Sequence, residues 1–302
     1  MSEAAYQVLL YYRYTRIEAA EAFAARHREF CEVLGLRGRI LVSEEGLNGT
    51  VSGLVAETEA YMEAMREDDR FRDMVFKVDG ADGHVFPKLS VKWRPEVVTL
   101  GLEKDEDIDP NELTGTYLNP EEWFEAMQRE DVVILDGRNR YESDLGRFKG
   151  AVCPDVEHFR DFPEWIEAHR AEWEGRRVLT YCTGGIRCEK LSGYLKRAGV
   201  EDVGQLEGGI IAYGKDESVR GRGFEGLCYV FDERLGVEVN RTEGRRVISR
   251  CVHCGEMSAR YRNCAWSECN EQIFCCERCE REFGRVCSAE CLENLGRIKE
   301  KC

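Results

Sequence analysis

The stretch Arg177-Val-Leu-Thr-Tyr-Cys-Thr-Gly-Gly-Ile-Arg-Cys-Glu-Lys190 decides the fold of the central part of this 302-residue chain. Its first five residues form a short apolar run typical of a buried parallel strand, and helical spacing follows the two glycines. Cys182 lies between the two, where the backbone N–H groups of a starting helix are unpaired and the helix dipole is positive. We therefore expect a strand, an anion-binding loop and a helix, in that order.

The loop from Cys182 to Arg187 carries the chemistry. A helix start and a nearby arginine both stabilise a thiolate, so we interpret Cys182 as the nucleophile. The residues between the two ends form an anion cradle, in which the glycines let the backbone amides turn inward; they are Thr183, Gly184, Gly185 and Ile186. Cysteine phosphatases use a longer Cys-x5-Arg loop, so the Cys-x4-Arg spacing favours sulfur carried as a persulfide. The alternative is a buried, inert thiol.

Cys188 is the second cysteine of this stretch, one residue beyond Arg187. It resolves a persulfide on Cys182 by forming a disulfide, or it only packs within the helix. Both interpretations stay open from the sequence. We count Cys182, Arg187 and Cys188 as the candidate catalytic residues.

The regions on either side of this stretch repeat the alternation of strand and helix. Val132–Leu135 is another short apolar run, and helical spacing occurs at residues 120–128, 163–173 and 189–198. Strands that alternate with helices favour a mostly parallel sheet with helices on its faces. We therefore predict an α/β domain around the Cys182 loop.

Four further motifs make this domain similar to the rhodanese family. They occur in the family's order and spacing around the Cys182 loop, and they are Thr116-Tyr-Leu-Asn-Pro-Glu-Glu-Trp123, Asp136-Gly-Arg138 with Glu142, Gly146-Arg-Phe-Lys-Gly-Ala151 and Leu206-Glu-Gly-Gly-Ile210. In rhodanese domains the Asp and Arg of the Asp-x-Arg motif are chiefly structural. The resemblance therefore gives Asp136 and Arg138 a supporting role rather than a catalytic one.

The first hundred residues predict a ferredoxin-like sandwich, because their pattern reads β-α-β-β-α-β. The expected strands are Tyr6–Tyr14, Arg39–Val42, Gly49–Val51 and Met74–Val78, and the expected helices are Ile17–Leu34 and Glu57–Arg66. We expect Gly46-Leu-Asn-Gly49 to form a structural turn between the middle strands, since Gly and Asn tolerate positive φ.

An acidic, turn-rich segment between Leu102 and Thr116 indicates an interdomain linker. We predict a multidomain α/β chain with four parts. These are a ferredoxin-like (acylphosphatase-like) α+β domain at residues 1–100, a linker at 101–116, a rhodanese α/β domain at 117–225 and a cysteine-rich zinc-binding region at 226–302.

Nine of the fifteen cysteines fall between Cys251 and Cys291. In a long chain without a signal peptide, such clustering favours metal binding over disulfides. Four pairs supply the ligands for two tetrahedral zinc sites; they are Cys251 and Cys254, Cys264 and Cys269, Cys276 and Cys279, and Cys287 and Cys291.

Several features of these metal sites stay open. Consecutive and crossed use of the pairs are both possible, and Cys275 is an alternative to Cys276. His253 is a bystander unless one site has three cysteines and one histidine. Sites filled by thiolates leave no position for water, so two structural zinc ions are the expectation and an iron–sulfur cluster is the alternative.

The net charge of −15 argues against indiscriminate binding of polyanions, because affinity for nucleic acid comes largely from Lys and Arg. From residue 237 onward, however, 12 basic residues face 11 acidic ones. Arginines near Tyr261 and Trp266 are suited to phosphates and stacked bases of RNA loops, and a solvated basic face is the alternative. The candidate RNA-binding residues are Arg241, Arg245, Arg246, Arg250, Arg260 and Arg262.

The order of domains resembles the bacterial oxygen-dependent tRNA uridine hydroxylase family over nearly the whole chain. The stretches that carry the resemblance are Ser43-Glu-Glu-Gly-Leu-Asn-Gly49, Gly115–Trp123 and Tyr181–Lys190. The resemblance implies 5-hydroxylation of the wobble uridine in the anticodon loop of tRNA, with dioxygen as co-substrate and an unidentified electron or sulfur donor. It makes Cys182 the catalytic cysteine, acting as a persulfide.

The residue patterns alone do not predict a hydroxylation reaction. We find no two-His-one-carboxylate set for iron and no flavin or nicotinamide motif. One alternative is a rhodanese-type sulfurtransferase that delivers sulfane sulfur to a small thiol or to tRNA, although such an enzyme needs neither flanking domain. Another is a non-enzymatic binding module, which can dispense with Cys182.

The N-terminal residues show no basic stretch leading into an apolar run. No window of the chain approaches the roughly 18 consecutive apolar residues that a membrane span requires. We therefore expect a cytoplasmic enzyme without a membrane partner.

Overall fold

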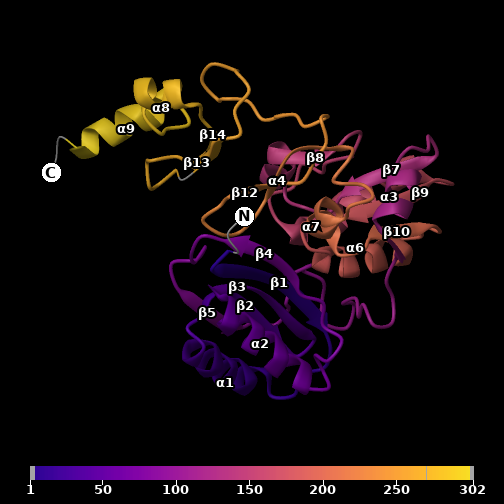
Figure 1. Ribbon diagram of the computed structural model, residues 1–302. Coiled ribbons are helices and arrows are strands. Elements are labelled where there is room, and N and C mark those ends of the chain that lie inside the picture. The colour runs from indigo at the N-terminus through magenta and orange to yellow at the C-terminus, as the bar shows by residue number, and fades with distance from the viewer. Residues whose placement is uncertain (1–3, 270, 300–302) are drawn as a thin grey trace.

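Two α/β domains lie side by side, and the cysteine-rich tail extends from them (Figure 1). The computed structural model describes residues 4–269 and 271–299. The outermost residues of the first and last predicted domains, 1–3 and 300–302, and residue 270 within the tail lie outside this description. The multidomain α/β fold predicted from the sequence is confirmed.

The N-terminal domain is a five-stranded sheet with strand order β4-β1-β3-β2-β5. Its elements are β1 (Tyr6–Tyr14), α1 (Ala20–Val33), β2 (Arg37–Ser43), β3 (Gly46–Leu54), α2 (Val55–Glu67), β4 (Lys77–Ala81) and β5 (Leu89–Trp93). The first four strands pair antiparallel in the ferredoxin-like order, as predicted. Strand β5, which was not predicted, adds to the edge parallel to β2. Strand β4, which was predicted at Met74–Val78, begins three residues later than expected, at Lys77.

The predicted turn at Gly46–Gly49 is wrong, because these residues begin strand β3. Ser43 pairs with Gly46, so the turn consists of Glu44 and Glu45. Gly46 has a φ of 152°, and an added Cβ would lie 2.2 Å from the carbonyl oxygen of Arg13. Glycine here permits the close approach of β1 and β3 rather than a turn.

Strand β1 is covered on both faces. Leu9 and Tyr11 belong to the core between the sheet and its helices. Leu10 points the other way, because successive side chains of a strand alternate, and it packs against the core of the second domain. The N-terminal sheet therefore forms one wall of the interface between the two domains.

The second domain is built on a parallel sheet of order β6-β10-β9-β7. Its strands are β6 (Thr116–Leu118), β7 (Val132–Asp136), β9 (Arg177–Tyr181) and β10 (Val203–Leu206). Its helices are α3 (Pro120–Ala126), α4 (Arg140–Leu145), α5 (Phe162–His169), α6 (Ile186–Arg197) and α7 (Gly209–Lys215). The helix predicted at 189–198 begins earlier, directly after Gly185, and the one predicted at 163–173 ends in a 3-10 turn at Arg170–Trp173.

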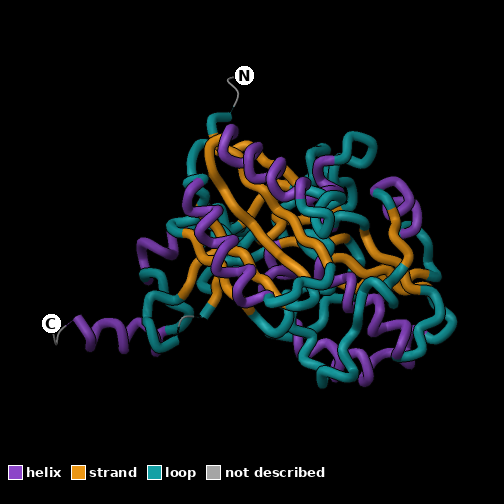
Figure 2. Tube along the Cα trace, turned by 90° about the horizontal axis from the view of Figure 1, so that it is seen from below, coloured by secondary structure: helices purple, strands orange, loops and turns teal. Residues whose placement is uncertain are grey.

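A small antiparallel sheet leads from this domain to the tail. It contains β8 (Gly146–Phe148), β11 (Phe224–Tyr229) and β12 (Gly236–Glu238). The tail follows with β13 (Tyr261–Asn263), β14 (Gln272–Phe274), α8 (Glu277–Phe283) and α9 (Ala289–Lys299), and α9 projects from the body of the molecule (Figure 2). None of the helices in the described part of the chain is both long and apolar enough to cross a bilayer.

Candidate active site and metal centres

The Cys182 loop lies at the carboxyl end of β9 and leads into α6. The backbone N–H of Gly185 donates a hydrogen bond to Cys182 Sγ at 3.1 Å. Gly185 has a φ of 103°, and an added Cβ would lie 2.9 Å from the Tyr12 hydroxyl oxygen. Only glycine fits this position without strain, so the second glycine of the loop shapes the sulfur site.

The surroundings of Cys182 favour its thiolate. Burial alone would raise the pKa of the Cys182 thiol, but the Cys188 thiol, the Arg187 charge and the backbone N–H groups of residues 187 and 188 lower that pKa to about 5. Burial and the neighbouring Cys182 raise the pKa of Cys188 well above its ordinary value. At neutral pH, Cys182 is therefore the thiolate and Cys188 the protonated thiol beside it.

Arg187 forms a two-pronged ion pair with Glu142 of α4. Its Nη1 and Nη2 atoms lie 2.5 and 2.8 Å from the Glu142 carboxylate oxygens, and the Glu142 side chain is fully buried. Thr183 Oγ1 donates to the same carboxylate at 3.3 Å. Glu142 thus compensates the charge of Arg187 and fixes the loop to α4. The sequence placed Glu142 in the rhodanese pattern but gave it no role.

Asp136 and Arg138 form a second ion pair beneath the loop, with both side chains fully buried. Arg138 Nε and Nη2 lie 2.8 and 2.6 Å from the Asp136 carboxylate, and Nη2 also donates to the Gly146 carbonyl. The Tyr181 hydroxyl donates to Asp136 at 2.7 Å. Tyr181 directly precedes Cys182, so this network fixes the end of β9 from which Cys182 extends.

Glu189, in the first turn of α6, connects the loop to the N-terminal domain. Its side chain is buried, and the Tyr12 hydroxyl of β1 donates to its Oε1 at 2.7 Å. The other oxygen, Oε2, accepts from the Tyr117 hydroxyl at 2.8 Å and from Thr114 Oγ1 and Gln205 Nε2 at 3.1 Å. The Glu189 carboxylate is thereby held by donors from both domains.

Lys190, the next residue, joins the two domains through ion pairs. Its ammonium lies 2.8 Å from Glu45, 3.1 Å from Glu96 and 2.8 Å from Asp107, and its side chain is fully buried. Glu45 belongs to the turn between β2 and β3, so the pair bridges the domain interface. Sequence reasoning missed both Glu189 and Lys190, although they end the stretch that decided the fold.

Strand β1 covers the loop. A Cβ added at Gly184 would lie 3.1 Å from Leu10 Cδ2, and Tyr12 lies against Gly185. Cys182 itself is 1% exposed. Cys182 therefore lies at the domain interface rather than on the open face of an isolated domain.

The tail brings its cysteines together as two groups of four. One contains Cys251, Cys254, Cys276 and Cys279, and the other contains Cys264, Cys269, Cys287 and Cys291. The pairs are thus crossed, the first with the third and the second with the fourth. Cys276 rather than Cys275 belongs to the first group, and His253 belongs to neither.

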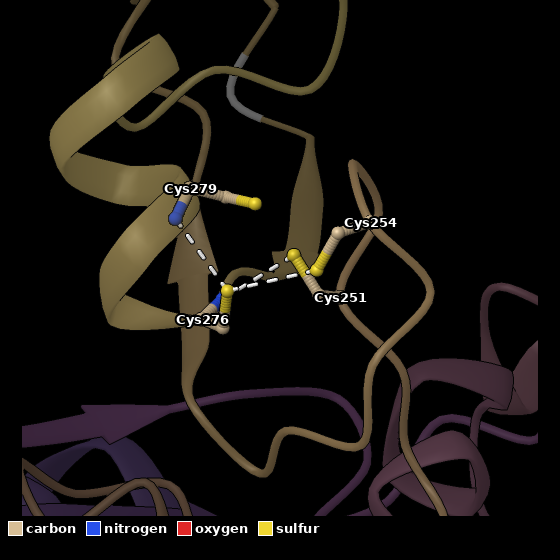
Figure 3. A group of neighbouring side chains, drawn as sticks. All are labelled: Cys251, Cys254, Cys276 and Cys279. Atoms are coloured by element: carbon tan, nitrogen blue, oxygen red, sulfur yellow. Dashed lines mark hydrogen bonds between the residues drawn. The ribbon is translucent and has the colours of Figure 1, made fainter.

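The geometry of both groups suits a tetrahedral ion. Figure 3 shows the first group, whose sulfurs come from the segment after Arg250 and from the start of α8. The sulfurs of Cys254 and Cys276 are 3.7 Å apart, and those of Cys269 and Cys287 are 3.6 Å apart. Four thiolates around a zinc ion at about 2.3 Å would be about 3.8 Å apart. Each group can therefore hold one metal ion.

The six arginines predicted to bind RNA all have partners within the chain. Arg241, Arg245 and Arg246 pair with Glu217, Glu238 and Glu225. Arg260 and Arg262 share Glu280, and Arg250 donates to the Gly255 carbonyl. Arg245 and Arg246 nevertheless stay largely accessible, with side chains 59% and 73% exposed.

Three family models match successive parts of the chain. They are the UPF0176 acylphosphatase like domain at residues 6–97, the rhodanese-like domain at 120–216 and the rhodanase C-terminal region at 225–292. A Bacillus licheniformis protein named tRNA uridine(34) hydroxylase is 55% identical over 95% of this chain and 88% of its own length. One of the same name from Bacillus cereus is 57% identical over 95% and 89%.

The chain belongs to the tRNA uridine(34) hydroxylase family. The family resemblance stated from the sequence is therefore confirmed. A solved rhodanese-like domain from Anabaena sp. is 20% identical, with a TM-score of 0.31 over 38% of this chain and 81% of that one.

Proposed function

We propose that this enzyme hydroxylates C5 of the wobble uridine, uridine 34, in tRNA, with dioxygen as co-substrate and Cys182 as the working thiol. The observation that carries the proposal is the thiolate-stabilising Cys182 loop, in a chain that matches the named hydroxylases over 95% of its length. The residues around Cys182 provide a nucleophile, a protonated thiol beside it at Cys188 and a domain interface that excludes water.

A second candidate function is sulfur transfer from a persulfide on Cys182 to a small thiol or to tRNA. The Cys-x4-Arg spacing favours it, because a loop of this length suits a sulfur atom carried as a persulfide. The flanking regions argue against it, because a transferase of this kind needs neither the N-terminal domain nor the cysteine-rich tail. An unidentified donor supplies electrons to the hydroxylase or sulfur to the transferase.

The use of dioxygen can be tested by isotope labelling of growing cells. Under ¹⁸O₂, the 5-hydroxyl oxygen of uridine 34 should carry ¹⁸O, as mass spectrometry of tRNA nucleosides would show. In H₂¹⁸O under ordinary air, that oxygen should stay unlabelled. Label that enters only from water would contradict oxygen-dependent hydroxylation.

We propose that each of the two cysteine groups of the tail binds one structural zinc ion. Purified full-length protein should contain two zinc ions per chain by metal analysis, because both groups offer four thiolates and no open position. Cys276→Ser should lose about one of them, whereas Cys275→Ser, at the neighbouring residue outside the group, should keep both. Bound iron with visible charge-transfer bands would contradict the zinc assignment.

The exposed pair Arg245 and Arg246 is proposed to contact the tRNA backbone. Arg245→Glu with Arg246→Glu should weaken tRNA binding and lower the slope of log Kd against log salt by about two. Any thiosulfate sulfurtransferase activity at Cys182 should stay at the wild-type level. The control is Arg28→Glu with Arg72→Glu, which makes the same charge change at exposed sites of the N-terminal domain. Equal losses in both double variants would contradict a specific contact.

A further inference from the structure

A cavity of about 280 Å³ lies between the two domains, beside the Cys182 loop. Tyr12 and Lys77 line it from the N-terminal domain, and Tyr117 and Glu189 line it from the rhodanese side. Tyr12 also contacts Gly185, whose N–H holds the Cys182 sulfur. Tyr12 therefore lies between the cavity and the loop that holds the Cys182 sulfur and contacts both.

A larger hollow of about 680 Å³ lies at the opposite edge of the parallel sheet. It is lined by residues next to the starts of β7 and β9, such as Asp131 and Arg177. Ligands of open α/β sheets bind at the carboxyl ends of the strands, where Cys182 lies. The smaller interdomain cavity is therefore the better candidate for a substrate site.

Lys77 presents a donor to the cavity. Its ammonium lies 5.2 Å from the centre of the Tyr12 ring, and no hydrogen bond or ion pair joins it to another residue in the described ranges 4–269 and 271–299. Burial lowers the pKa of Lys77 to about 8, although the negative charges of Cys182 and Glu189 act to raise it. The Tyr12 ring is thus a cation–π partner but not a hydrogen-bond acceptor, and a half-buried ammonium without an acceptor is costly unless a ligand completes its hydrogen bonds.

Glu189 presents an acceptor to the same space. A carboxylate oxygen can accept about two hydrogen bonds, and within the described part of the chain Oε1 accepts only from Tyr12. Two further acidic residues, Asp73 and Glu207, line the cavity, whereas its basic residues are Arg13 and Lys77. This excess of acidic groups disfavours a phosphate inside, whereas an uncharged ring with both a carbonyl and an N–H fits.

We propose that this cavity receives the uracil base of the nucleotide to be hydroxylated, as a deepening of the proposed function, on which it rests. The rings of Tyr12 and Tyr117 lie against the base, as aromatic side chains do in single-stranded RNA complexes. The Lys77 ammonium donates to a ring carbonyl, and Glu189 accepts from N3–H. The volume lies just below the roughly 300–1,000 Å³ of sites for drug-sized ligands, which suits one base turned out of its stack.

Binding of two RNA hairpins to the full-length protein tests the cavity. One has uridine at the wobble position of its loop, and the other has a ribose without a base there. Wild type should bind the uridine hairpin about 5- to 100-fold more tightly by fluorescence anisotropy. Lys77→Gln should reduce this preference to below about threefold. Lys92→Gln, at an exposed lysine of β5, should leave it unchanged.

Equal binding of both hairpins by wild type, or an unchanged preference in Lys77→Gln, would overturn the cavity assignment alone. Failure to bind either hairpin would instead count against the proposed tRNA function. Photocrosslinking of wild type to a hairpin with 4-thiouridine at the wobble position gives an independent readout. Peptides containing Tyr12, Lys77 or Tyr117 should carry the crosslink, and crosslinks confined to the cysteine-rich tail would contradict the proposal.

Discussion

Replacement of Cys182 by serine is expected to abolish 5-hydroxyuridine at position 34 of tRNA. The loop lowers the pKa of the Cys182 thiol to about 5, whereas a serine hydroxyl stays protonated at the same place. Loss of a nucleophile of this kind reduces rates by at least about 10³-fold. The measurement is mass spectrometry of tRNA nucleosides from a strain that lacks the chromosomal gene and expresses the variant.

Two further cysteine variants make this result interpretable. Cys153→Ser changes a half-buried cysteine of the same domain that lies outside the Cys182 loop and whose sulfur donates to the Ala151 carbonyl, and it should leave the modification intact. Cys188→Ser decides between the two interpretations of Cys188. A large loss of modification with normal stability supports a resolving thiol, and full activity supports packing. A normal level of 5-hydroxyuridine in Cys182→Ser would refute the role of Cys182.

Asp136→Asn is expected to destabilise the rhodanese domain by about 3–5 kcal/mol. The substitution leaves the Arg138 charge fully buried without its carboxylate, and breaking a buried pair by removing one partner costs this much. It also weakens the hydrogen bond from Tyr181, the residue that precedes Cys182. Urea unfolding followed by tryptophan fluorescence would measure the effect, because Trp123, Trp165 and Trp173 lie in this domain.

Asp131→Asn is the matched control for that experiment. Asp131 pairs with Arg129 at the surface, where both side chains are 60% exposed, and solvent screens such a pair. The urea midpoint should therefore stay at the wild-type value. Equal midpoints for Asp136→Asn and wild type would show that the buried pair does not support the fold as described.

The loop and the domain order were predictable from the sequence because their signals are local. Cys182, the two glycines and Arg187 occur within six consecutive residues, and the strand and helix around them have clear periodicity. The four cysteine pairs were likewise predictable, because the two members of each pair are separated by only a few residues. Strand β5 was missed although Leu89, Val91 and Trp93 alternate with polar residues, because the run is only five residues long and the four-stranded ferredoxin-like pattern requires no fifth strand.

The surroundings of the site depend on contacts between distant parts of the chain. Tyr12 bonds to Glu189 across 177 positions, and Lys190 reaches Glu45 in the other domain. Neither periodicity nor motif spacing indicates which face of the N-terminal domain packs against which face of the rhodanese domain. The crossed use of the cysteine pairs is hidden for the same reason, since either pairing satisfies the ligand spacing.

Analysis of tRNA nucleosides from a strain lacking this gene, with and without the restored wild-type gene, distinguishes hydroxylation from sulfur transfer. We predict that 5-hydroxyuridine at position 34 disappears on deletion and returns with the gene, while thiolated nucleosides stay unchanged. Unchanged 5-hydroxyuridine together with the loss of a thiolated nucleoside would contradict hydroxylation and establish sulfur transfer instead.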